Sequence, residues 1–132
     1  MRRLPHSHIR AFTLVEIMIV VAILAILATL AMSNYIRARK RSEAAKVLDD
    51  LRLLDGALDQ YALENNKLTG DPAEFSDLQP YLILSTQMAI NGTDLFGQPY
   101  GPYTVDTVPK VAPYTYGALS DVAPPDFWSP YY

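Results

Sequence analysis

The hydrophobic and polar positions divide the chain into three sections. In the first, from Phe12 to Ala31, nearly every residue is apolar, and one carboxylate, Glu16, lies close to the start. A helix rises about 1.5 Å per residue, so this run spans about 30 Å, the thickness of bilayer hydrocarbon. The pattern predicts a transmembrane helix over residues 12–36, preceded by a short basic leader, residues 1–11.

The second section is amphipathic. Apolar residues recur in steps of four and three, as they do on one face of a helix: Val47, Leu51, Leu54, Leu58 and Tyr61, flanked by Ala44, Leu48 and Ala62. The other face is expected to carry charged residues such as Asp49, Asp50, Arg52 and Asp59. No proline lies between His6 and Pro72, so one helix is predicted from about Phe12 to about Asn65, with residues 37–67 as its amphipathic part.

The third section, residues 68–132, alternates short apolar groups with proline and glycine. Residues 74–84 are expected to form a short helix that runs into a turn or strand. Residues 97–108 and 112–119 carry β-branched and aromatic residues between Pro and Gly, which favours short antiparallel strands. Residues 120–132 are expected to be an irregular, proline-rich tail. The predicted fold is α+β, a lollipop in which a long N-terminal helix carries a small antiparallel β-sheet head.

Charge is distributed unevenly, although the net charge is only −3. Basic residues flank the apolar run on both sides: Arg2, Arg3 and Arg10 before it, and Arg37, Arg39, Lys40 and Arg41 after it. From Leu68 onward Lys110 is the only base, against seven acids: Asp71, Glu74, Asp77, Asp94, Asp106, Asp121 and Asp126. An acidic head argues against nucleic acid as a partner.

Composition excludes the common catalytic and transition-metal sites. The chain has no cysteine, and its two histidines, His6 and His8, precede the apolar run. The usual Cys or His constellations cannot be built, and no glycine-rich phosphate-binding motif occurs. The sequence predicts a protein that is not an enzyme and requires no cofactor. Calcium is a weaker candidate: Asp121 and Asp126 in the tail could supply oxygen ligands, the alternative being two solvated acids.

The segment Arg10-Ala11-Phe12-Thr13-Leu14-Val15-Glu16 resembles the processing motif of type IV prepilins and type II secretion pseudopilins. Over about residues 1–66 the order of features is also similar: a basic leader, the Phe-Thr-Leu-Val-Glu signature, a long apolar run and an unbroken amphipathic continuation. In the head, residues 94–103 resemble the Asp-Pro-Trp-Gly-x-Pro-Tyr turn of major pseudopilins, with Leu95 and Phe96 in place of Pro and Trp.

The resemblance implies a set of roles. A membrane prepilin peptidase would cut between Ala11 and Phe12, and the new amine of Phe12 would be N-methylated. Glu16 would guide assembly by pairing with the amine of a neighbouring subunit. The protein would form a helical homo-oligomer with other pilins or pseudopilins, with an assembly platform protein as a further partner. It would start from the bacterial inner membrane, with its N-terminus cytoplasmic and its head periplasmic.

The chain departs from the family pattern in three respects. Ala11 stands where Gly usually precedes the cut, and Ser33 stands where many members have a helix-kinking proline. The cysteine pair that closes the C-terminal loop of many pilins is missing, which favours a pseudopilin. The family's calcium loop is also longer and richer in Gly and Asp than residues 120–132.

Two functions from different classes fit these features. One is a structural subunit of a type II secretion pseudopilus or type IV pilus-like filament, and the other is a solitary single-pass membrane-anchored binding protein with an acidic periplasmic head. Glu16 discriminates between them, because an acid costs about 2.5–3.5 kcal/mol near the membrane centre and normally marks a function. A lone anchor has little use for it, so the structural subunit is favoured. The choice among secretion, pilus and DNA-uptake filaments stays open.

Overall fold

The computed structural model describes residues 12–83 and 86–132. The leader and the residue before the expected cut, Ala11, lie outside these ranges. The chain divides into two compact units between Ile36 and Arg37, and each is described by itself.

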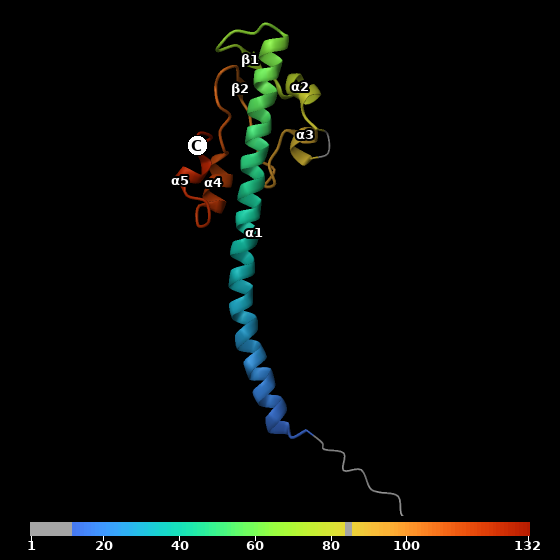
Figure 1. The fold of residues 1–132 in the computed structure, drawn as a ribbon, viewed down its shortest axis with the longest axis vertical. Helices are drawn as coiled ribbons and strands as arrows, with labels where there is room; N and C mark the ends of the chain where they lie inside the picture. Colours follow the sequence, from blue (N-terminus) through green and yellow to red (C-terminus); the bar gives the residue numbers. More distant parts are fainter. Residues whose placement is uncertain (1–11, 84–85) are drawn as a thin grey trace, which may run out of the picture. The chain divides into compact units, whose positions relative to one another are not determined.

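The longest element is helix α1, Leu14–Glu64, which passes Ser33 and Gly56 without a break (Figure 1). Its end agrees with the sequence prediction. The backbone N–H of Asn65 bonds to the carbonyl of Tyr61, and that of Lys67 bonds to the carbonyl of Ala62. Asn66 adopts a left-handed conformation with φ of 50°, which Asn tolerates better than most residues and which turns the chain out of the helix.

In the first unit, every side chain from Phe12 to Ile36 is exposed. By length and composition, α1 is able to cross a membrane, and none of its apolar window is buried within the protein. A helix that is apolar on all sides requires lipid or other helices around it.

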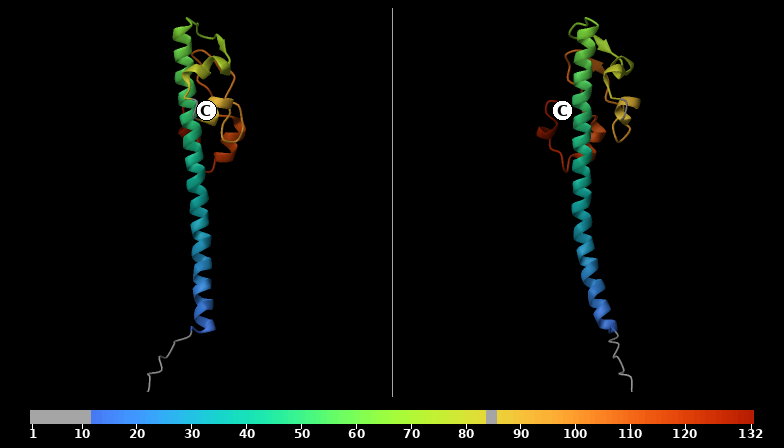
Figure 2. Two further views of the ribbon diagram at one scale, coloured as in Figure 1. Left: turned by 90° about the vertical axis from the view of Figure 1, so that its right-hand side faces the viewer. Right: turned by 45° about the vertical axis from the view of Figure 1, so that its right-hand side comes forward.

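In the described residues of the second unit, seven shorter elements lie along α1 (Figures 1 and 2). They are β1 (Pro72–Ala73), α2 (Phe75–Leu78), the 3-10 helix η1 (Gln79–Tyr81), α3 (Gln87–Asn91), β2 (Tyr103–Thr104), α4 (Pro113–Leu119) and α5 (Pro125–Trp128). Strands β1 and β2 pair antiparallel, with Pro72 opposite Thr104 and Ala73 opposite Tyr103. The architecture is α+β, as predicted.

The core of this unit is built on the predicted stripe of α1. Val47, Leu51, Leu54, Leu58 and Tyr61 are all buried. The other elements contribute, among others, Leu78, Met88, Tyr100, Leu119 and Trp128. Because burial of a Leu contributes about 1.5–3 kcal/mol, the stripe supplies a large share of the head's stability.

Two predictions for the head are wrong. Residues 112–119 are not a strand but contain α4, and the tail is not irregular because it contains α5. Each helix has proline at its first position, where the fixed φ suits a helix and the missing N–H is not needed. In α4 the buried residues are Thr115 and Leu119, one helical turn apart, whereas Tyr114 is exposed. Burial therefore follows the helical period and not the β-propensity of Tyr and Thr.

The predicted strand over residues 97–108 is also much shorter than expected. Only Tyr103 and Thr104 form β2. The residues before them turn, with Gly97 at φ of 76°. The short helix expected in residues 74–84 is present as α2 and η1, whereas α3 was not predicted.

Candidate functional site

The N-terminus of α1 is closed by a reciprocal pair of side chains, Thr13 and Glu16. The backbone N–H of Thr13 donates to Oε2 of Glu16 over 2.9 Å, and the hydroxyl of Thr13 donates to the same oxygen over 3.1 Å. In return, the backbone N–H of Glu16 donates to the Thr13 hydroxyl over 3.2 Å. This is a capping box, which satisfies backbone donors that the first turn of a helix leaves unpaired.

The capping box gives Glu16 a local partner that the sequence analysis missed. The signal was present, because Thr-x-x-Glu directly before an apolar run is the sequence signature of this motif. The carboxylate also lies at the positive end of the helix dipole, which stabilises it further. Both hydrogen bonds use Oε2, and Oε1 accepts no hydrogen bond from any residue in the described part of the chain.

The surroundings of this site are apolar and open. Phe12 is 80% exposed, directly before the capping box. Farther along α1, Ala22, Ala25, Ala28 and Ala31 recur at every third position, and all are exposed. Small residues allow helices in a membrane to approach closely. The arrangement therefore combines a carboxylate at a helix start with a surface suited to helix packing.

The head holds a buried polar pair where the sequence analysis expected an exposed acid. Asp50 is buried, and the hydroxyl of Tyr100 donates to its Oδ2 over 3.1 Å. Burial raises the pKa of Asp50 above its ordinary value, and the hydrogen bond from Tyr100 acts in the opposite direction. Burial, with the nearby Asp50 carboxylate, also raises the pKa of Tyr100. The prediction that Asp50 faces solvent is wrong, because Tyr100 from the head covers this side of α1.

A second buried acid, Asp94, organises the turn that resembles the pseudopilin motif. Its Oδ1 accepts the backbone N–H groups of Phe96 and Gln98, each over 2.8 Å. Its Oδ2 accepts the hydroxyl of Thr115 on α4. Asp94 thus links the turn to α4, which gives it a structural role.

The two candidate calcium ligands have different surroundings. Nζ of Lys40 lies 3.0 Å from Oδ1 and 2.9 Å from Oδ2 of Asp121, and this contact lowers the pKa of the carboxyl. Asp126 lies in the first turn of α5 and is exposed. In residues 12–83 and 86–132, no three acidic or His side chains gather as metal ligands. Calcium binding stays a prediction, and at Asp121 the ion would have to displace Lys40.

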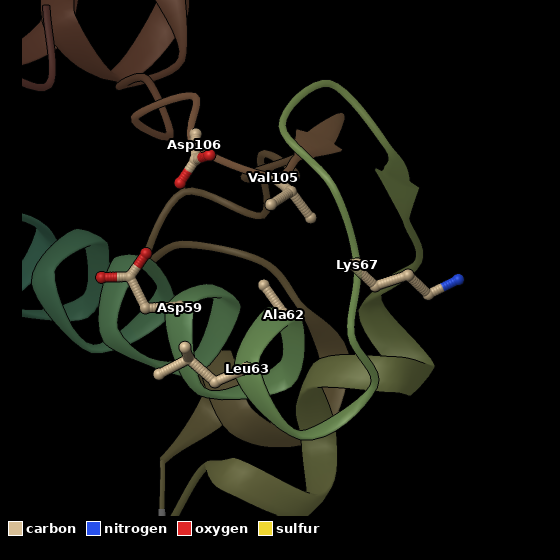
Figure 3. A pocket seen from close by; sticks show the side chains of 6 residues that line it. All are labelled: Asp59, Ala62, Leu63, Lys67, Val105 and Asp106. Atoms are coloured by element: carbon tan, nitrogen blue, oxygen red, sulfur yellow. The ribbon is translucent and has the colours of Figure 1, made fainter.

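An open hollow of about 400 Å³ lies near the C-terminal end of α1 (Figure 3). It is lined by Asp59, Ala62, Leu63, Lys67, Val105 and Asp106. The Lys67 side chain points away from the two carboxylates in this view. The lining of the hollow contains no hydroxyl nucleophile and no His, so the hollow offers no constellation for nucleophilic catalysis.

Comparison with known proteins finds a family that matches the N-terminal region of the chain. Residues 6–32 match the family described as the prokaryotic N-terminal methylation motif. The chain is 45% identical over 58 residues to the type II secretion system core protein G of Klebsiella pneumoniae, covering 44% of this chain and 41% of that protein. It is 41% identical over 58 residues to the protein of the same name from Pectobacterium carotovorum subsp. carotovorum, covering 44% of this chain and 37% of that protein.

A pilus protein is also similar. The type IV wide pilus major component of Thermus thermophilus is 36% identical over 69 residues, covering 52% of this chain and 53% of that protein. The chain spans about two-fifths of the length of the secretion-system relatives. No solved structure matches it.

Proposed function

We propose that this chain is a structural subunit of a pseudopilus or a pilus-like filament of the type IV prepilin and type II secretion pseudopilin family, and the match of residues 6–32 to the prokaryotic N-terminal methylation motif supports the proposal. The observation that carries the proposal is the Glu16 carboxylate at the start of α1, in the apolar segment of residues 12–36, whose side chains are all exposed. Such a helix is suited to packing against copies of itself, and its acid requires a cationic partner once water is excluded.

The first step is processing by a prepilin peptidase between Ala11 and Phe12. The cut creates an amine on Phe12, which is then N-methylated. The methylation motif at residues 6–32 supports this step. The new amine is cationic, and it lies four residues before Glu16 in the sequence, directly before the capping box.

The second step is assembly through Glu16. In a single chain its Oε2 is engaged by Thr13, whereas Oε1 has no hydrogen-bond donor among the described residues. A neighbouring subunit can therefore offer its Phe12 amine to Oε1 without breaking the capping box. Pairing of the two charges in apolar surroundings offsets the free-energy cost that each buried charge would carry without a partner.

The localisation of the protein and its partners follow from this function. The subunit enters the bacterial inner membrane with its N-terminus cytoplasmic and its acidic head periplasmic. An assembly platform protein and other pilins or pseudopilins are its partners. The named relatives, a secretion-system core protein and a pilus component, support a structural role rather than catalysis.

The experiment that tests the proposal replaces Glu16 by Val in a strain without the native subunit. Cleavage and membrane insertion should persist, since the apolar run becomes more apolar. Filament formation, measured by electron microscopy and by sedimentation of sheared fibres, should be lost or strongly slowed. Glu43→Gln, which removes a carboxylate from α1 outside the apolar run, is the matched control and should assemble normally.

Normal filaments from the Glu16→Val protein would overturn the role of the carboxylate. A processed native protein that forms no filament with any pilin partner would instead favour a solitary membrane-anchored binding protein.

A further inference from the structure

Four basic residues follow the apolar part of α1 without a break in the helix: Arg37, Arg39, Lys40 and Arg41, called the basic band below. The two residues before the band, Tyr35 and Ile36, carry exposed side chains. Tyrosine is enriched where a membrane meets water, and Lys and Arg side chains near helix ends extend into the headgroup layer. With residues 12–36 in a bilayer, the basic band follows at the level of the lipid headgroups.

Two of the four side chains of the basic band form ion pairs with described residues. Lys40 pairs with Asp121, and Nε of Arg39 lies 2.9 Å from Oε1 of Glu43. Arg37 and Arg41 form no ion pair with any residue in the ranges that the structure describes, and both are exposed. They are four residues apart, so they project from one face of α1, about 6 Å apart along its axis.

The part of the chain that follows the basic band has the opposite charge. From Val47 to Tyr132 the chain carries twelve acids against three bases. An anionic surface would therefore attract the basic band and repel residues 47–132. Guanidinium groups match phosphate oxygens in a two-pronged hydrogen-bonding geometry, which makes a phosphate headgroup a suitable occupant.

We propose that Arg37 and Arg41 bind the phosphate groups of anionic lipids in the leaflet on the head side of the membrane. The proposal rests on insertion of residues 12–36 and does not require filament formation. The contact holds the subunit at a fixed depth before assembly. It also has to break when a subunit leaves the bilayer.

The test is arginine footprinting of the full-length protein in lipid nanodiscs. One set of discs contains phosphatidylcholine alone, and the other contains phosphatidylcholine with phosphatidylglycerol. Phenylglyoxal, an uncharged reagent for guanidinium groups, is applied, and modification of each arginine is measured by peptide mass spectrometry. We expect the reactivity of Arg37 and Arg41 to fall about fivefold in the anionic discs. Arg52, exposed farther along α1, is the internal control and should not change.

A second measurement uses variants and the lipid that remains bound after extraction from mixed bilayers. Native protein should retain phosphatidylglycerol in preference to phosphatidylcholine. The double variant Arg37→Gln/Arg41→Gln should lose this preference. The control Lys46→Gln/Arg52→Gln removes the same charge from exposed positions of the same helix and should keep it.

Three results would overturn the proposal. One is equal reactivity of Arg37 and Arg41 in both kinds of disc. Another is protection of Arg37 and Arg41 in phosphatidylcholine discs that increases with protein density, which would show that the basic band contacts acidic residues of a second copy. The third is equal protection by soluble glycerol phosphate in neutral discs, which would show a phosphate site independent of the membrane. Each of these leaves the filament proposal intact, because none measures assembly.

Discussion

The hydroxyl of Tyr100 donates a hydrogen bond to Oδ2 of Asp50 across 50 positions of sequence. Both side chains are buried, and they join the segment before β2 to helix α1. A buried carboxylate without a partner is strongly unfavourable, so the pair constrains where the head packs on the helix.

The first prediction removes this hydrogen bond. Tyr100→Phe preserves the ring but leaves Asp50 without its side-chain donor, so the free energy of unfolding should fall by about 1–3 kcal/mol. Thermal or denaturant unfolding followed by the fluorescence of buried Trp128 measures the change. Tyr114→Phe, at a residue 63% exposed, is the control and should unfold like the native protein. If both variants match the native protein, the pair contributes nothing to stability.

The second prediction concerns pH. The pKa of Asp50 is raised in the folded head, chiefly by burial, above its ordinary value of 3.8. The folded state therefore binds this proton more tightly than the unfolded state does. The resulting stabilisation is complete at pH values below the pKa of Asp50 in the unfolded chain. It is lost as the pH rises through the higher pKa of Asp50 in the folded head.

Replacement of Asp50 by Asn removes this titration. Melting temperatures measured across the pH range above 3.8 should decline less steeply with rising pH in Asp50→Asn than in the native protein. Asp49→Asn removes an exposed carboxyl next in sequence and should keep the native slope. An unchanged slope in Asp50→Asn would mean that Asp50 ionises equally easily in both states.

The third prediction concerns the turn held by Asp94. Asp94→Ala leaves two backbone N–H groups and the Thr115 hydroxyl without their acceptor. The loss should exceed about 3 kcal/mol, because hydrogen bonds to charged groups contribute about 1.5–3 kcal/mol each. Asp94→Asn keeps one carbonyl oxygen and should recover part of the stability. Denaturant unfolding provides the comparison, and equal losses in the two variants would contradict the role of Oδ1.

The long helix and its buried stripe were predictable because their signal is periodic and local. Val47, Leu51, Leu54 and Leu58 recur at the spacing of one helical face, and all are buried. No proline interrupts α1, and its end coincides with Asn and Gly residues that favour a turn. The stripe could be predicted without knowing which segments cover it, because a helix buries one face with the same period whatever packs against that face.

The head was less predictable because its elements depend on tertiary contacts. The residues of α4 have high β-propensity, yet Pro113 starts a helix that buries Thr115 against Asp94. The burial of Asp50 depends on Tyr100, a partner that the helical pattern cannot reveal. At the candidate site, Glu16 was identified by resemblance, whereas the local signature that also involves Thr13 was overlooked.

The fourth prediction tests the stripe. Leu58→Asp places a charge in the core of the head and should reduce the free energy of unfolding by more than about 4 kcal/mol. The matched control is Leu53→Asp on the same helix, where the native side chain is 43% exposed. Trp128 fluorescence of the full-length proteins in detergent should show a largely unfolded head in the first variant only. A cooperative melt of Leu58→Asp at the native temperature would refute the packing.

The last prediction separates the two roles of Glu16. Thr13→Val removes the hydroxyl from the capping box but leaves the carboxylate charged. Loss of a cap destabilises a helix end by about 1 kcal/mol, so amide hydrogen exchange in the first turn of α1 should accelerate about fivefold. Glu16→Gln makes the opposite change, because its side-chain carbonyl can still accept from the Thr13 N–H but carries no charge. First-turn exchange should remain close to native in this variant, whereas filament formation should fail. Because Thr13→Val keeps the charge that a neighbouring amine requires, it should still assemble, even if more slowly. If Glu16→Gln assembles normally and Thr13→Val does not, then the capping box, and not the charge, is what assembly requires.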